Sequence, residues 1–291
     1  MTPEELDLVC DLVHDLCGIA LDNSKDYLIE SRLSRLLDQV QTPTYTDLVR
    51  HARGPQGLSL QKEIINSITT QETLFFRDSN PFDAVRFKAL PELIDEKSKS
   101  FNPKRLRIWS AACSTGQEPY SLAMTLIETI PDIHSWDVSI TATDISNEAL
   151  AKASRGWFPE HEVARGLDQT RRTRFFTPEK DGWKIKDEVR YLLNFQPFNL
   201  LKDFSHVGQF DIIFCRNVVI YFNPEDRKRA YLGLTNQLAP NGFLFVGASE
   251  SLIDLGDRFQ PQHHCNTVYY QPNRVLPEFV IANKVKTESG I

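Results

Sequence analysis

Residues Ser110–Ser121 have the types and the order of a ligand-binding loop. They read SAACSTGQEPYS, follow the short apolar run Leu106–Trp109 and precede the helix-like run Leu122–Ile127. A strand, a loop of small residues and a helix N-terminus together present backbone N–H groups to a nucleotide-like ligand. The loop lacks the Gly-Lys-Ser/Thr of a P-loop, and it has only Gly116 where a dinucleotide fingerprint needs three glycines. It therefore predicts a ligand without a pyrophosphate.

Two acidic residues indicate which chemical groups this ligand carries. Glu118 lies within the loop, where it could hold a cationic or hydroxyl-bearing group. S-adenosylmethionine (SAM) carries a sulfonium, an ammonium and a ribose diol, so it fits. Asp144 ends the predicted strand Ser139–Thr143, and an acid at the end of the second strand commonly accepts hydrogen bonds from ribose hydroxyls. The alternative for Asp144 is a helix N-cap.

Polar residues follow two further predicted strands. Asn199 and Leu200 come shortly after the run 189–195, where an asparagine is also an ordinary turn residue. Arg216 and Asn217 follow the apolar run 210–215, and open α/β sheets bind ligands at the carboxyl ends of their strands. The alternative for this pair is a strand cap with a surface arginine. Tyr221 is close enough in sequence to wall the same cavity, with core packing as the equal alternative.

The segment Thr69–Arg77 reads TTQETLFFR and precedes the first predicted strand. We expect Phe75 and Phe76 to anchor it in apolar contacts. Thr73 and Arg77 are polar residues on the same stretch, and Arg77 could also be an ordinary surface charge.

Together with Ser110–Ser121 and Phe214–Phe222, this segment resembles the CheR family of chemotaxis receptor methyltransferases. The resemblance covers roughly residues 5–272. It implies SAM as methyl donor, S-adenosylhomocysteine (SAH) as product, and glutamate side chains on the cytoplasmic helices of chemoreceptors as acceptors. The product would be a glutamate methyl ester formed in sensory adaptation.

The resemblance also assigns residues. It places Arg77 against the methionine carboxylate and the reacting centre, and the Asn199–Leu200 pair against the adenine. The family usually has Asn where this chain has Gln71. The predicted catalytic residues are Arg77 and Tyr221. The predicted cofactor-binding residues are Gln71, Thr73, Arg77, Glu118, Asp144, Asn199, Leu200, Arg216 and Asn217.

Methyl transfer to a carboxylate has modest chemical requirements. A glutamate with a reference pKa of about 4.3 is already ionised at neutral pH and needs no general base. Alignment and exclusion of water can then carry catalysis. The sequence agrees, because it offers no Cys–His or Ser–His–Asp constellation.

Three basic residues, Lys25, Arg32 and Arg35, lie on one predicted helix. At 3.6 residues per turn they fall within roughly 80° of arc. A solvated face is one interpretation. The resemblance favours the other, a docking strip for acidic chemoreceptor helices.

The order of predicted elements indicates an α/β fold with added parts. Residues 1–80 show helical periodicity, starting with the capping box Thr2–Glu5, and predict a small all-α domain, to which the resemblance assigns receptor docking. Residues 81–273 alternate strands and helices, which predicts a doubly wound, mostly parallel, Rossmann-like sheet, and the resemblance implies that this is the methyltransferase domain. We expect a small antiparallel β insertion at 155–188, an antiparallel edge strand at 267–270 and a tail at 274–291. The other expected strands are 106–110, 138–143, 189–195, 210–215 and 243–247, and the expected helices are 83–96, 118–130, 146–153 and 225–238.

Composition argues against several classes of protein and of binding site. The formal net charge of -6 argues against a general nucleic-acid binder. Scattered cysteines without a CxxC pair argue against a disulfide framework or a zinc site, and His263–Cys265 lacks accompanying ligands. No apolar run reaches the roughly 18–20 residues that span a bilayer, and the acidic N-terminus lacks a signal pattern. We expect a cytoplasmic monomer without metal. A methyltransferase for RNA or a small molecule, and a SAM-binding signalling module without turnover, are the alternatives.

Overall fold

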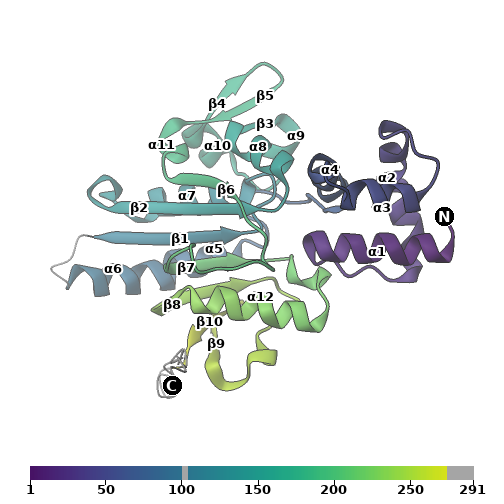
Figure 1. The fold of residues 1–291 in the computed structure, drawn as a ribbon. Coiled ribbons are helices and arrows are strands. Elements are labelled where there is room, and N and C mark those ends of the chain that lie inside the picture. The colour runs from purple at the N-terminus through teal and green to yellow at the C-terminus, as the bar shows by residue number, and fades with distance from the viewer. Residues whose placement is uncertain (100–103, 274–291) are drawn as a thin grey trace, which may run out of the picture.

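A helical domain precedes an α/β domain in the computed structural model, which describes residues 1–99 and 104–273 (Figure 1). The predicted capping box begins the first helix, and Gly18 ends it in the left-handed conformation at φ 76°. The helices of this domain are α1 (Pro3–Cys17), α2 (Asp26–Gln39), α3 (Tyr45–Arg53) and α4 (Leu58–Ile68). They pack around a core of their own, to which α2 contributes Ile29, Leu33 and Leu36. Helix α2 begins at Asp26, because Asn23–Lys25 form a 3-10 turn, η1.

The α/β domain is built on a seven-stranded sheet with the order β6-β2-β1-β7-β8-β10-β9. Its strands are β1 (Arg105–Ala111), β2 (Asp137–Asp144), β6 (Leu193–Pro197), β7 (Phe210–Cys215), β8 (Leu238–Val246), β9 (Phe259–His264) and β10 (Thr267–Pro272). The first five run parallel, and β10 and β9 run antiparallel to their neighbours. The prediction of a mostly parallel sheet is confirmed.

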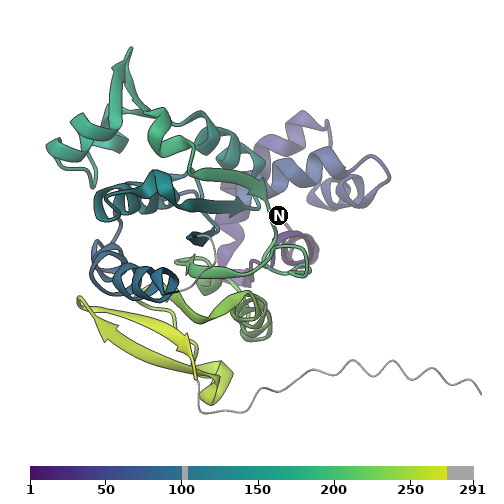
Figure 2. The ribbon, with the colours of Figure 1, turned by 90° about the vertical axis from the view of Figure 1, so that its left-hand side faces the viewer.

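Helices cover both faces of this sheet. One face carries α5 (Asn80–Ala84), the π-helical η2 (Val85–Ala89), α6 (Leu90–Ser98) and α7 (Gln117–Thr129). The opposite face carries α12 (Pro224–Asn236), and Figure 2 shows α6 and α12 on opposite sides of the strands. Side chains alternate along a strand, so Ile108 joins the first core and Trp109 the second. The sheet is therefore doubly wound, with α8 (Asn147–Arg155) packed beside β2 and β6.

The predicted insertion forms a small antiparallel sheet with the order β3-β5-β4. Its elements are β3 (Trp157–Pro159), α9 (Glu160–Val163), α10 (Gln169–Phe175), β4 (Phe176–Glu179), β5 (Gly182–Ile185) and α11 (Asp187–Arg190). The expected antiparallel β insertion is confirmed, and it also contains three short helices.

Several boundaries differ from the expectations. The strand expected at 189–195 begins at Leu193, because Val189 belongs to α11 and its side chain is buried there. Strand β8 begins at Leu238, which was predicted to end a helix. Strand β10 is antiparallel as expected, but β9 forms the edge. Cys265 and Asn266 join these two strands in a tight turn with φ of 47° and 53°, and without a glycine the hairpin gave no clear signal. The tail at 274–291 lies outside the described residues.

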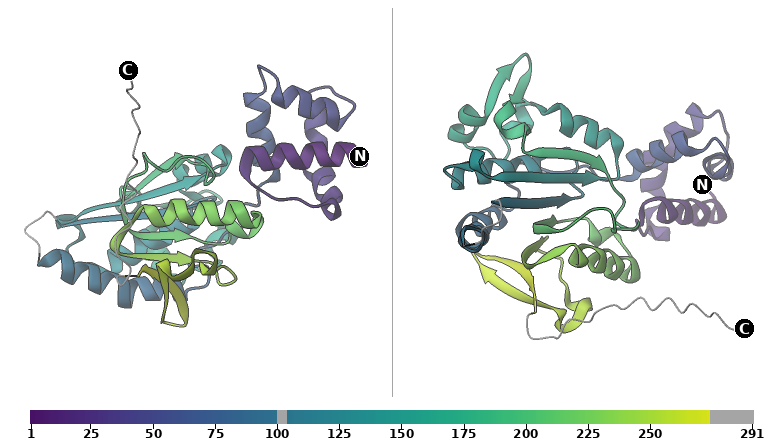
Figure 3. Two further views of the ribbon diagram at one scale, coloured as in Figure 1. Left: turned by 60° about the horizontal axis from the view of Figure 1, so that its bottom comes forward. Right: turned by 60° about the vertical axis from the view of Figure 1, so that its left-hand side comes forward.

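The helical domain packs against the carboxyl ends of the parallel strands, as Figures 1 and 3 show. Ala20 N donates to Tyr221 O at 2.8 Å, and Ile19 forms a β-bridge with Phe222. His14 Nε2 lies 2.6 Å from Asp226 Oδ2 at the start of α12. The two domains therefore enclose the edge of the sheet at which ligands bind in this type of fold. Among residues 1–99 and 104–273, no helix combines the length and apolarity needed to cross a membrane.

Candidate active site

A pocket of about 1000 Å³, including its open mouth, lies between the helical domain and the carboxyl edge of the sheet. All the residues predicted for catalysis and cofactor binding line it: Gln71, Thr73, Arg77, Glu118, Asp144, Asn199, Leu200, Arg216, Asn217 and Tyr221. The helical domain also contributes Cys17 and Ile19, which sequence reasoning missed.

Asp144 ends β2 and faces the loop that follows β1. Its Oδ2 accepts from Ser114 N and its Oδ1 from Ser146 N, each at 2.8 Å. The N-cap of α8 is Ser146, so the N-cap interpretation of Asp144 was wrong. Burial raises the pKa of Asp144, against the lowering effect of the backbone N–H groups. Each carboxylate oxygen has two lone pairs, so further acceptor capacity remains for ligand hydroxyls.

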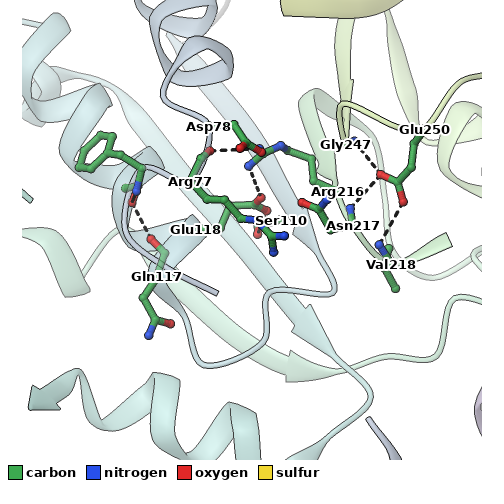
Figure 4. Close-up of polar contacts among 12 residues, drawn as sticks. Arg77, Asp78, Ser110, Gln117, Glu118, Arg216, Asn217, Val218, Gly247 and Glu250 are labelled. Carbon is green, nitrogen blue, oxygen red and sulfur yellow. Dashed lines mark hydrogen bonds and ion pairs between the residues drawn. The ribbon is translucent and has the colours of Figure 1, made fainter. Parts of the chain in front are cut away.

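Arg216 forms the centre of a buried polar cluster (Figure 4). Its guanidinium donates to Glu118 Oε2 at 3.2 Å and to Asp78 Oδ2 at 2.7 Å, and its side chain is 1% exposed. Ser110 Oγ donates to the other oxygen of Glu118 at 2.8 Å. Burial raises the pKa of Glu118, although Arg216 opposes the shift. Among the described residues, the buried Nε of Arg216 has no hydrogen-bond partner.

The segment Thr69–Ser79, hereafter the connecting segment, links the two domains without a helix or a strand. Phe75 is fully buried, and its ring meets those of Phe158 and Phe176 edge-on at 5.0 and 5.6 Å. Phe76 N donates to Ser121 Oγ at 2.9 Å. The prediction that the two phenylalanines anchor this segment is confirmed, and the insertion supplies much of the anchorage.

Polar contacts hold both ends of the connecting segment. Arg216 Nη2 donates to Arg77 O at 3.1 Å, so the backbone of Arg77 is fixed to the strand end. The half-buried side chain of Arg77 lines the pocket and donates to Glu72 O at 3.3 Å. Gln71 Nε2 donates to Ser146 Oγ at 3.2 Å. The amide that replaces the family's usual asparagine is therefore engaged with the start of α8 while it still lines the pocket.

Asn199 is a turn residue, as one interpretation of the sequence expected, and it also contacts the helical domain. Its Oδ1 accepts from Leu201 N at 2.9 Å in a local turn, and its Nδ2 donates to Leu16 O at 3.0 Å, at the end of α1. The side chain thus ties the helical domain to the pocket wall. Leu200 is buried beside it. Tyr221 is 40% exposed at the pocket, so core packing does not explain this residue.

The two cysteines at the pocket are not suited to be nucleophiles. Cys113 and Cys17 both line the pocket. Burial raises the pKa of Cys113 well above its usual range and that of Cys17 to about 11. Both are thiols at neutral pH, so neither offers the thiolate needed for nucleophilic catalysis.

The three basic residues of the predicted docking strip have different environments. Arg35 is exposed on α2, and Lys25 is half-buried just before this helix. Arg32 instead donates to the backbone oxygen of Ile68 and, at 3.2 Å, to Thr70 Oγ1. Arg32 therefore holds the start of the connecting segment.

Two acids of the site were missed by sequence reasoning. Asp78 is the partner of Arg216 described above. Glu250 lies after β8, and its carboxylate accepts backbone N–H groups of the pocket loop (Figure 4). Glu250 follows a strand that ends at the sheet edge, which was the signal already used for Asp144, whereas Asp78 lies in the connecting segment and follows no strand.

Comparisons with known proteins agree with this geometry. Residues 71–268 match the CheR methyltransferase SAM-binding domain, and residues 4–69 match the CheR methyltransferase all-alpha domain. The chain is 42% identical over 259 residues to chemotaxis protein methyltransferase 1 of Vibrio cholerae. The aligned region covers 86% of this chain and 90% of the relative. It is 39% identical over 261 residues to chemotaxis protein methyltransferase Cher2 of Pseudomonas putida, covering 88% and 93%. The chain thus belongs to the CheR family and is a SAM-dependent methyltransferase.

Proposed function

We propose that this enzyme transfers the methyl group of SAM to glutamate side chains on the cytoplasmic helices of chemoreceptors, forming methyl esters in sensory adaptation. The observation that carries the proposal is the convergence of separate chain segments on one pocket. Arg77 and Tyr221 line it together with the buried acids Glu118 and Asp144. The names of the relatives support a role in chemotaxis.

The side chains of the pocket complement the cofactor. Asp144 has acceptor capacity for the ribose hydroxyls, and Glu118 is an acceptor for the ammonium group. Arg77 is the donor for the carboxylate, and Arg216 holds Glu118 in the cofactor site. Leu200 offers an apolar surface to the adenine, beside Asn199. We assign Gln71, Thr73 and Asn217 to the remaining wall of the cofactor site.

The reaction needs little beyond orientation. SAM supplies an electrophilic methyl group. An oxygen of the ionised acceptor glutamate forms the new bond to carbon as the bond to sulfur breaks, which leaves SAH and a neutral ester. No proton moves, so no general base is required. Arg77 orients the reactants, and Tyr221 shapes the mouth and limits access of water.

The outlying parts have their own proposed roles. We assign residues 1–80 to receptor docking through Lys25, Arg32 and Arg35, and residues 81–273 to the methyltransferase domain. Chemoreceptor helices with acidic methylation sites are the chemical complement of the basic strip. We propose a cytoplasmic monomer.

Labelled SAM distinguishes this function from its alternatives. The enzyme is incubated with a panel of receptor cytoplasmic fragments, and label on protein is tested for release by mild base. Base-labile label that disappears when the acceptor glutamates are changed to alanine is the expected result. Binding of SAM without transfer to any fragment would favour a signalling module without turnover, and transfer to RNA or a small molecule would replace the proposed substrate.

A further inference from the structure

The carboxylate of Glu250 is surrounded by backbone donors from two chain segments. Its Oε2 accepts from Asn217 N at 2.8 Å and from Gly247 N at 2.6 Å. Its Oε1 accepts from Val218 N and Val219 N, both at 3.1 Å. The residue is 9% exposed. Hydrogen bonds between backbone N–H groups and a charged acceptor are stronger than neutral ones, and a buried site favours them further.

Three of these donors are successive residues of the loop that follows β7. Asn217 adopts φ of 58°, a left-handed conformation that side-chain-bearing residues seldom take. The chain then turns into the 3-10 helix η4 (Val219–Tyr221). Without a partner, the buried N–H groups at this turn would carry a desolvation cost. Glu250 therefore stabilises a backbone shape that the loop would not prefer by itself.

Gly247 is shaped for this contact. A Cβ on Gly247 would lie 2.5 Å from Glu250 Oε2 and 3.0 Å from Asn217 N, so no larger residue fits without displacing the carboxylate or the loop. The loop in question supplies Arg216, Asn217 and Tyr221 to the pocket.

We propose that Glu250 is a positioning residue for the methyltransferase reaction. It lies outside the residues that line the pocket and acts through the backbone of Asn217–Val219, which it holds in the shape that presents Asn217 and Tyr221. The proposal rests on the placement of SAM in this pocket. Asp144→Ala tests that placement separately, because Asp144 has no contact with Glu250.

Glu250→Gln keeps the shape of the side chain but removes its charge and replaces one acceptor oxygen with an amide donor. We expect SAH affinity to weaken by about tenfold and kcat at saturating SAM to fall as well, at a temperature at which the variant is folded by circular dichroism. Asp211→Asn is the matched control. Asp211 is a buried carboxylate at the opposite end of β7, 8% exposed, and accepts from Arg107 N at 2.8 Å. It should leave SAH affinity and kcat near the wild-type values.

Gly247→Ala disturbs the same contact without changing any polar side chain. It should reproduce the losses in SAH affinity and kcat. The double variant should be no more impaired than the more impaired of the two single variants, because both changes break the same contact. Wild-type affinity and kcat in folded Glu250→Gln, or additive losses in the double variant, would overturn the proposal.

Hydrogen exchange of the unmutated enzyme covers the case in which neither variant folds. The amides of Asn217, Val218 and Val219 should exchange slowly before any ligand is added. Rapid exchange there would show that the anchor does not hold the loop.

Discussion

The two walls of the pocket are built in different ways. The sheet wall is built at the carboxyl ends of parallel strands, where Asp144 ends β2, Arg216 follows β7, and Glu118 lies at the start of α7 after the loop that follows β1. The hydrogen-bond register of β1, β2 and β7 fixes where those strands end. The connecting segment has no regular structure and depends on side chains from other parts of the chain. Arg32 holds its start, the insertion holds Phe75, and Arg216 holds the backbone of Arg77. Changes at Asp144 should therefore act mainly on ligand binding, whereas changes in the connecting segment should also reach the alignment of the reactants.

The largest effect is expected from Phe75→Ala. Removing a fully buried aromatic side chain that packs against Phe158 and Phe176 should reduce the free energy of unfolding by about 3–5 kcal/mol. Turnover should fall even in the protein that stays folded, because Arg77 follows two residues later. Denaturant unfolding and single-turnover assays measure the two effects. Phe75→Leu, the control, should recover much of the stability; full activity in folded Phe75→Ala would show that the anchor does not position Arg77.

Arg77→Ala should lower turnover by about 100-fold or more, because the orienting cation is lost from the pocket. Its melting temperature should change little, since the side chain is half-buried and, within residues 1–99 and 104–273, donates to Glu72 O alone. Arg77→Lys should rescue poorly, because a point charge cannot replace a planar fork with five donors. Near-normal turnover in either variant would remove Arg77 from the reaction centre.

Asp144→Ala tests the sheet wall. The loss of hydrogen bonds to a charged acceptor should weaken SAM and SAH binding by about tenfold or more, which calorimetry can measure. Asp137→Ala is the matched control, because Asp137 begins the same strand, away from the pocket, in an ion pair with Arg105 and Arg107. Equal affinities in the two variants would contradict the ribose assignment.

Two properties that depend on the acids of the sheet wall, SAH affinity and folding stability, should change with pH in opposite directions. Burial raises the pKa of both Asp144 and Glu118, and their ionised forms are the ones that accept from the ligand. SAH affinity should therefore fall on acidification, and this fall should begin at a higher pH than for ordinary carboxyls with pKa near 4. For folding the sign is reversed: a carboxyl whose folded pKa is raised contributes less stability as pH rises through that pKa. The melting-temperature difference between the ligand-free wild type and Asp144→Asn should thus shrink at acid pH, and a difference independent of pH would contradict the role of burial.

The same contrast explains what the sequence could predict. Glu118, Asp144 and Arg216 were predicted from the residues themselves, since polar side chains after apolar strands of a parallel sheet must meet at one edge. The connecting segment gave no periodic signal, and Arg77 was assigned through a family resemblance. Contacts between distant parts, such as Asn199 with Leu16, depend on how the domains pack, which local patterns do not contain. The glycine-free β9–β10 turn was missed for a local reason, since its residues do not belong to the usual hairpin sequences.

The smallest and most separable effect concerns the docking strip. Reversing the charge of Arg32 was a natural test from the sequence, but Arg32 also donates to Ile68 O and Thr70. Arg32→Glu would therefore disturb the connecting segment together with any docking surface.

The cleaner test reverses the charges of Lys25 and Arg35 by changing both to Glu. The KM for receptor fragments should rise several-fold with SAM affinity unchanged, because attraction between exposed charges is modest and screened beyond about 8 Å at physiological salt. The wild-type KM should likewise rise with salt. Arg50→Glu is the control, an exposed arginine of α3 paired with Asp47. If the reversed variant and the salt series both left the KM unchanged, α2 would be an ordinary solvated face, and docking would have to use another surface, with the 155–188 insertion as the next to test.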